Sequence, residues 1–309
     1  MLMDIILVIL IGGITGYIFK SKSYWRKPSA IIQQTGLIFL LASMGASIGM
    51  SKSTIESLPL IGLKAFIYAA FNIMFSILIV YIMVRKFFEN STDIGERVKE
   101  HNKKGKFKIN YMTLTILGSV AVGIIGGYFI IPYKGLPVIE NVSFYSLRIL
   151  LFLVGMDMGG NNKLFKSLKN MGLRVLIIPF SIIIGSIAGS LVAGTVFSMK
   201  VNESLSIGAG YGWYSLSGVL LKEMGGEILG ATAFLTNVFR ELSAVILIPV
   251  LAEKINGYVA IAPAGAASMD TLLPVISASV TPEISLVSFI NGAILSFLVP
   301  VLVPFFYRL

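Results

Sequence analysis

The sequence predicts an all-α polytopic membrane protein with about eight full transmembrane helices and two further interrupted or re-entrant segments. Of its 309 residues, 56% are hydrophobic and only 13% are charged, and the mean hydropathy is +0.87. A soluble protein carries about 25% charged residues. Apolar runs of about 18 residues or more recur along the chain, and such a run crosses the hydrocarbon core as a helix. The composition therefore excludes a soluble domain.

Each predicted full span is one of these apolar runs. The first run follows Asp4 rather than basic residues and has no small-residue cleavage site after it, so we expect a retained helix and not a cleaved signal peptide. The eight predicted spans are 3–19, 32–50, 61–84, 112–131, 144–160, 173–197, 228–251 and 284–306.

Two other segments, 204–221 and 257–280, are hydrophobic but interrupted by glycine and proline. Glycine is about 1 kcal/mol less favourable than alanine inside a helix. Non-helical backbone at membrane depth occurs only where it is buried in protein or lines a water-filled cavity. These segments either cross as broken helices or re-enter as hairpins, and a solute site is the first hypothesis for them.

The first part of the chain repeats itself at an offset of 110 residues. Glycines carry the match, since Gly13, Gly16, Gly45 and Gly49 recur as Gly123, Gly126, Gly155 and Gly159. Each unit holds three crossings, and an odd number turns the second unit upside down, which is typical of transporters. A fainter repeat at an offset of 55 relates Gly210 to Gly265 and Pro249 to Pro304.

The repeats and the charges predict the domain organisation. Residues 1–84 form a first three-helix scaffold repeat, 85–110 a charged cytoplasmic linker, 111–200 a second, inverted scaffold repeat, and 201–309 a substrate-binding and transport unit. Lys and Arg gather in 20–27, 85–108 and 163–174, three loops on one side of the membrane. That side is predicted to be cytoplasmic, which puts both termini outside the cytoplasmic (inner) membrane. The net charge of +10 thus reflects topology, not nucleic-acid binding.

The sequence A-G-Y-G-W-Y-S-L-S-G at 209–218 is the first candidate site. Its aromatic rings beside unwound polar backbone suit an organic cation, although Trp and Tyr are also common at the membrane interface. The candidate residues here are Gly210, Gly212, Trp213, Tyr214, Ser215 and Ser217.

A second candidate group lies in A-S-M-D-T-L-L-P at 267–274. Asp270 is an ionisable residue inside a membrane segment, and such residues usually face a cavity or a partner. Ser268, Asp270 and Thr271 also suit the cap of a helix, so a structural role is the alternative.

Asn237, Arg240 and Glu241 form the third candidate group. Residues three and four apart share a helix face, so Asn237 neighbours both others. A buried Arg tends to need a carboxylate partner, and Glu241 and Asp270 are the nearest candidates by type. The alternative is a structural pair that ties the helix to the scaffold.

Three carboxylates, those of Asp270, Glu241 and Asp157, are candidates for coupling to an ion. Asp157 lies near the cytoplasmic end of its predicted span, where a carboxylate is also explained by the interface alone.

Several enzyme classes are excluded. Residues 45–49 match the G-x-S-x-G pattern of serine hydrolases, but the single histidine, His101, lies in the charged linker. The chain has no cysteine, no H-E-x-x-H motif and no phosphate-binding loop. No catalytic residue, metal site or cofactor is expected.

The runs G-Y-G-W-Y-S-L-S-G-V-L-L, R-E-L-S-A-V-I-L-I-P and A-S-M-D-T-L-L-P resemble the lysine exporter family LysO, most densely over 200–305. The resemblance implies an inner-membrane exporter of L-lysine and close analogues, driven by a gradient of H+ or Na+, with both termini outside. Members often carry N-D where this chain has Thr236 and Asn237, so one carboxylate is lost here.

On this hypothesis, N–H groups around 215–218 hold the lysine carboxylate. Asp270 or Glu241 takes an ammonium group, and Trp213 or Tyr214 lies along the aliphatic stem. The alternatives are a cation/proton antiporter of inverted-repeat type and an exporter of another small cationic solute. The expected partners are the solute, the coupling ion and membrane lipid; the oligomeric state, including a homo-oligomer, is left open.

Overall fold

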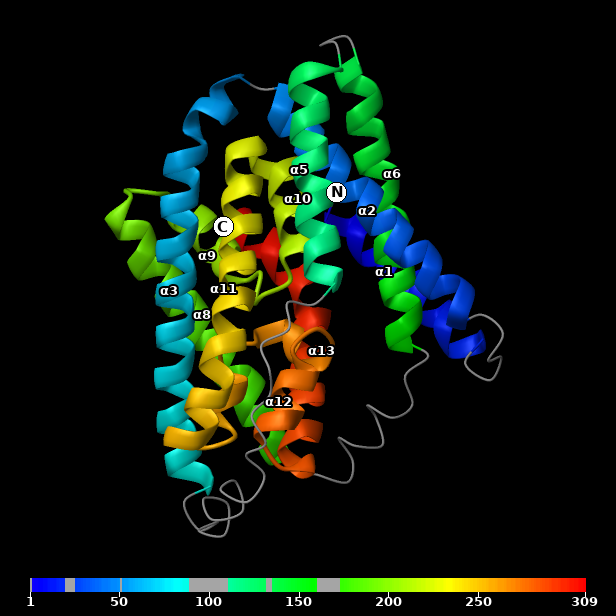
Figure 1. Cartoon of the computed structure of the whole chain (residues 1–309). Coiled ribbons are helices and arrows are strands. Elements are labelled where there is room, and N and C mark those ends of the chain that lie inside the picture. Colours follow the sequence, from blue (N-terminus) through cyan, green and yellow to red (C-terminus); the bar gives the residue numbers. More distant parts are fainter. Residues whose placement is uncertain (1, 20–25, 51, 89–110, 132–134, 160–172) are drawn as a thin grey trace.

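The computed structural model describes residues 2–19, 26–50, 52–88, 111–131, 135–159 and 173–309, and every regular element within them is a helix (Figure 1). The prediction of an all-α protein is confirmed. Four of the described helices are long and apolar enough to cross a membrane; their apolar spans are Ile55–Phe87, Arg174–Val196, Glu227–Lys254 and Pro282–Tyr307.

The helices of the first part follow the predicted spans but several are longer. They are α1 (Leu2–Phe19), α2 (Arg26–Met50), α3 (Lys52–Phe88), α5 (Tyr111–Phe129), α6 (Leu136–Gly159), the 3-10 turn η3 (Leu173–Leu176) and α8 (Ile177–Val196). Helix α3 extends beyond the predicted span 61–84 at both ends, because a helix continues past the apolar residues that hydropathy detects. The predicted linker therefore begins with helical residues up to Phe88, and 89–110 lies outside the described residues.

Both interrupted segments are broken, as the glycine and proline positions predicted. The first consists of α9 (Val201–Gly208) and α10 (Tyr214–Gly225), and the second of the 3-10 turns η4 (Val259–Ile261) and η5 (Gly265–Met269) with α12 (Leu273–Ser279). Each is followed by a long helix, α11 (Glu227–Lys254) in the first case and α13 (Pro282–Tyr307) in the second.

The helices gather in two groups (Figure 1). In one, α1 packs against α6, and α2 packs against α5 and α6. In the other, α3 packs along α8 and α11, while α10 packs on α11 and η5 on α13. The two broken segments thus lie among α3, α8, α11 and α13, where protein surrounds their backbone.

Glycine allows α2 and α5 to pack closely against each other. A Cβ added at Gly127 would lie 2.1 Å from the carbonyl oxygen of Ala46, and one added at Gly123 would lie 2.2 Å from that of Ala42. Small residues let helix backbones approach in this way inside a membrane.

The neighbours Gly126 and Gly127 test this contact. Gly127→Ala forces α2 and α5 apart, and overpacking of this kind costs about 1–3 kcal/mol. We expect the apparent melting temperature in detergent to fall by about 5 °C. Gly126→Ala, whose Cβ meets nothing within 4 Å, is the control. Equal melting temperatures for the two variants would contradict this account of the packing.

Candidate functional site

The two broken segments touch each other at their breaks. In the first, Tyr211 and Gly212 have positive φ angles of 44° and 99°. In the second, Gly265 has a φ of 56°. The amide of Ala266 donates a hydrogen bond of 2.8 Å to the carbonyl oxygen of Tyr211. A Cβ at Gly265 would lie 2.0 Å from that same oxygen, so the contact requires glycine.

Asn237 on α11 holds the first break. Its Oδ1 accepts a hydrogen bond of 2.7 Å from the amide of Gly212, and its Nδ2 donates to the Ser217 hydroxyl at 2.9 Å and to the carbonyl of Ala233 at 3.0 Å. A Cβ at Gly210 would lie 2.4 Å from this Nδ2. Four of the predicted residues, Gly210, Gly212, Ser217 and Asn237, are therefore brought together, and Asn237 replaces the helical bonds that the break removes.

Asn291 on α13 serves the second break in the same manner, and the sequence analysis missed it. Its Nδ2 donates to the carbonyl of Gly265 at 3.1 Å and to the hydroxyl of Ser268 at 2.9 Å. Ser268 and Ser288 exchange two hydroxyl-to-carbonyl bonds of 2.9 Å. The signal was present in the offset of 55, because Asn291 lies within one residue of the position that corresponds to Asn237.

Arg240 is buried with an exposed fraction of 1%. Its Nε donates to the carbonyl of Pro263 at 3.0 Å, and one terminal nitrogen donates to the carbonyl of Ala262 at 3.1 Å. The guanidinium also donates to the hydroxyls of Ser186 and Ser76. These partners differ from the carboxylate that the sequence predicted. Carbonyl and hydroxyl oxygens accept its hydrogen bonds instead, because the crossing of α3, α8 and the second break brings them to it.

Glu241 and Asp270 gather around the hydroxyl of Tyr214. This hydroxyl interacts with the Glu241 carboxylate, and the negative charge of Asp270 also acts on it. Glu241 is 4% exposed, whereas Asp270 is an exposed residue. One Asp270 oxygen accepts a 2.6 Å bond from the amide of Thr271, which precedes α12. This bond lies in the turn before α12 and does not cap that helix, whose N-cap is Leu272 without a side-chain cap bond, so the structure does not support the capping alternative for Asp270.

The remaining predicted residues lie around this centre at different depths. Trp213 is half-buried against the apolar core, and its carbonyl accepts a 2.8 Å bond from the hydroxyl of Ser217. Ser215 is buried in the first turn of α10. Asp157 belongs to α6, but its side chain lies outside the part of the chain that the structure describes.

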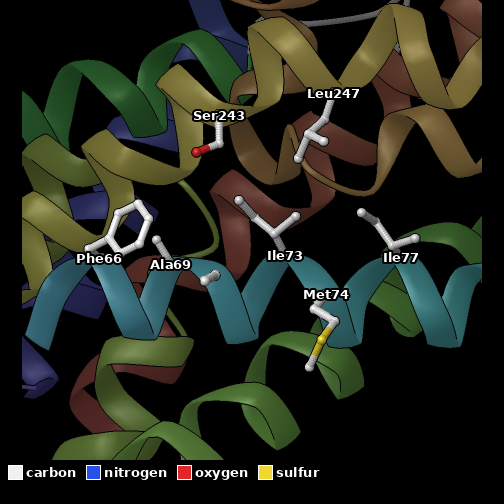
Figure 2. A pocket seen from close by; sticks show the side chains of 8 residues that line it. Phe66, Ala69, Ile73, Met74, Ile77, Ser243 and Leu247 are labelled. Atoms are coloured by element: carbon white, nitrogen blue, oxygen red, sulfur yellow. The ribbon is translucent and has the colours of Figure 1, made fainter.

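A hollow of about 350 Å³ between α3 and α11 contains none of the predicted site residues. Figure 2 shows Phe66, Ile73 and Ile77 on α3 pointing toward Ser243 and Leu247 on α11. Its lining is almost wholly apolar, which does not suit a charged solute.

The chain matches a family model described as lysine exporter LysO over residues 117–307. The chain belongs to the lysine exporter LysO family. Together with its apolar helices, this membership makes the chain a multi-pass membrane protein of an exporter family, which is not an enzyme class.

Two relatives extend the similarity of this LysO family member. It is 29% identical to "Lysine exporter LysO" of Escherichia coli over 306 residues, which cover 97% of this chain and 98% of that protein. It is also 30% identical over 193 residues to a Haemophilus influenzae protein named "Putative lysine exporter", which cover 62% of this chain and 96% of that protein.

Gly265 tests whether this LysO family member needs the contact between its two breaks. Gly265→Ala combines a positive φ with a clash against Tyr211, and we expect the melting temperature to fall and solute export to be lost. Gly226→Ala is a matched control, because Gly226 also has a positive φ, of 87°, but a Cβ there meets nothing within 4 Å. The control carries only backbone strain, since Gly226 combines its positive φ with a ψ of 176°, a region that is nearly exclusive to glycine and costs other residues about 1–3 kcal/mol. Similar losses in both variants would show that strain alone, and not the contact, matters.

Proposed function

We propose that this chain exports L-lysine and close analogues across the cytoplasmic membrane, in exchange for H+ or Na+. One observation carries the proposal. The carboxylates of Glu241 and Asp270 share the surroundings of the Tyr214 hydroxyl, at the start of α10, beside the touching breaks. The family described as lysine exporters supplies the substrate class.

The site offers a partner for each charged group of lysine. Lysine carries two ammonium groups, and Glu241 and Asp270 are two carboxylates at different depths. The lysine carboxylate binds at the N-terminus of α10, near Ser215 and Ser217, because the first amides of a helix point outward and its dipole favours an anion. Trp213 and Tyr214 cover the aliphatic stem.

Export against a gradient needs an ion that uses the same groups. A proton or Na+ that neutralises Asp270 or Glu241 competes with the ammonium group of lysine, and this competition couples the two fluxes without ATP. Asp157 is the third carboxylate proposed for this role. Ionisable residues inside a membrane segment commonly serve such relays.

The proposed architecture is an inverted repeat with both termini outside. Its support lies in the pairing of the helices. At an offset of 110 residues, α1 corresponds to α5 and α2 corresponds to α6. The packing of α1 against α6 therefore corresponds to the packing of α5 against α2, and both contacts are present. An offset of 55 likewise relates the first broken segment and α11 to the second and α13. Such repeats allow alternating access around a central site.

Carboxylate substitutions test the proposed function. We expect Asp270→Asn and Glu241→Gln each to reduce uptake of radiolabelled lysine into everted vesicles by at least about tenfold, since each loses an ion pair with the substrate of about 1.5–3 kcal/mol. Glu253→Gln removes the same charge from an exposed position at the end of α11 and serves as the control. Full lysine uptake by Asp270→Asn would overturn the site.

Counterflow in proteoliposomes tests the coupling. Separate pH and Na+ gradients are imposed, and the gradient that drives lysine accumulation identifies the ion. Ion flux that proceeds without any amino acid would favour the cation/proton antiporter instead.

A further inference from the structure

Ser76 and Ser186 mark the point where the two scaffold units meet. They are 110 residues apart, which is the offset of the repeat, and their hydroxyl oxygens lie 3.3 Å apart. The backbones of α3 and α8 also approach closely here, since a Cβ at Gly185 would lie 2.5 Å from the Cα of Ser76. Equivalent residues of two repeats come into contact only at or near the axis that relates the repeats.

Arg240 binds both of these serines from one side. One terminal nitrogen donates to Ser186, and the other donates to Ser76 at 3.4 Å. The nitrogen that donates to Ser76 also donates to the carbonyl of Ala262, and Nε donates to the carbonyl of Pro263. The planar fork of an arginine can hold several acceptors in fixed directions. Arg240 therefore joins the second break to the two units at their meeting point.

Ser76 and Ser186 occupy equivalent positions in the two repeats, but their hydrogen bonds with Arg240 differ. Ser186 accepts a short hydrogen bond, whereas Ser76 lies at the far limit of one. When a transporter built from inverted repeats changes its open side, one repeat or bundle rocks against the other around the site. An arginine at the axis between the repeats then moves its shorter hydrogen bond from one serine to the other.

We propose that Arg240 is a positioning residue that docks the second break on Ser186 in the state seen here and on Ser76 in the state that opens to the opposite side. The proposal rests on the proposed alternating-access export. It assigns Arg240 to the movement of the break, and through the break to the placement of Asp270, rather than to contact with lysine. Four of its hydrogen bonds already go to protein groups in this state.

The serine pair supplies a matched test. Ser186→Ala and Ser76→Ala both remove the hydroxyl pair, but each removes a different bond of Arg240. Ser186→Ala disfavours the present state and Ser76→Ala the opposite one, and the apparent affinity of a ligand scales with the population of the state that binds it. We expect the ratio of the KM for lysine in everted vesicles to that in right-side-out vesicles to shift in opposite directions, by on the order of tenfold.

Ser181→Ala is the control on the same helix, because among the described residues the Ser181 hydroxyl donates to the carbonyl of Ile177, within α8. We expect it to leave the KM ratio unchanged. Shifts in the same direction for Ser76→Ala and Ser186→Ala, or no shift in either, would overturn the proposal.

Arg240→Lys separates positioning from substrate contact. It keeps the charge but loses the fork, so we expect the maximal rate to fall about tenfold while KM changes less than about twofold. A large rise in KM at an unchanged maximal rate would make Arg240 a lysine ligand and overturn the proposal. If Arg240→Lys does not fold, Ser76→Ala and Ser186→Ala still test the proposal.

Melting temperatures distinguish a failure of this proposal from a failure of the proposed function. We expect Ser186→Ala to melt at a lower temperature than Ser76→Ala, since it loses the shorter bond; equal values would count against the docking. Absence of lysine counterflow in the unaltered protein would instead reject the proposed function, whatever the two serine variants show.

Discussion

The rest of the structure depends on one constraint: backbone that leaves the helix deep in an apolar protein must find hydrogen-bond partners there. A buried polar group without a partner costs several kcal/mol in such surroundings. Three side chains meet this requirement. Asn237 serves the first break, Asn291 serves the second, and Arg240 binds two carbonyls of the second break. These residues are held in long helices, so they also fix where each break sits.

The positions of the breaks create the candidate site. Because the first break ends at Trp213, Tyr214 and Ser215 become the first residues of α10, and their amides belong to a helix terminus rather than to its middle. Because the second break ends in the turn at Asp270, its carboxylate acts on the Tyr214 hydroxyl, with which Glu241 also interacts. Carboxylates and a helix N-terminus in one place are the groups that a zwitterion with an extra ammonium requires.

The glycines divide into two roles that follow from their surroundings. Those on α2 and α5 remove side chains from a helix crossing, and their backbones remain helical. Gly212 and Gly265 instead take positive φ angles within the breaks. The first role stabilises rigid groups of helices, and the second permits two non-helical segments to touch. The proposed export uses both roles, since in it the packed groups move against each other while the two breaks stay in contact.

The sequence by itself determined the all-helical membrane class, the four long apolar helices and both interruptions, because hydropathy and the conformational limits of Gly and Pro act over a few residues. It also identified Asn237, Glu241 and Asp270 as polar groups at membrane depth. Only the tertiary structure decided their partners. Arg240 was expected to pair with a carboxylate, but it binds two serines and two carbonyls. Asn291 gained its role because α13 passes beside Gly265. Hydrogen-bond partners depend on how helices distant in sequence cross, and no local pattern contains that information.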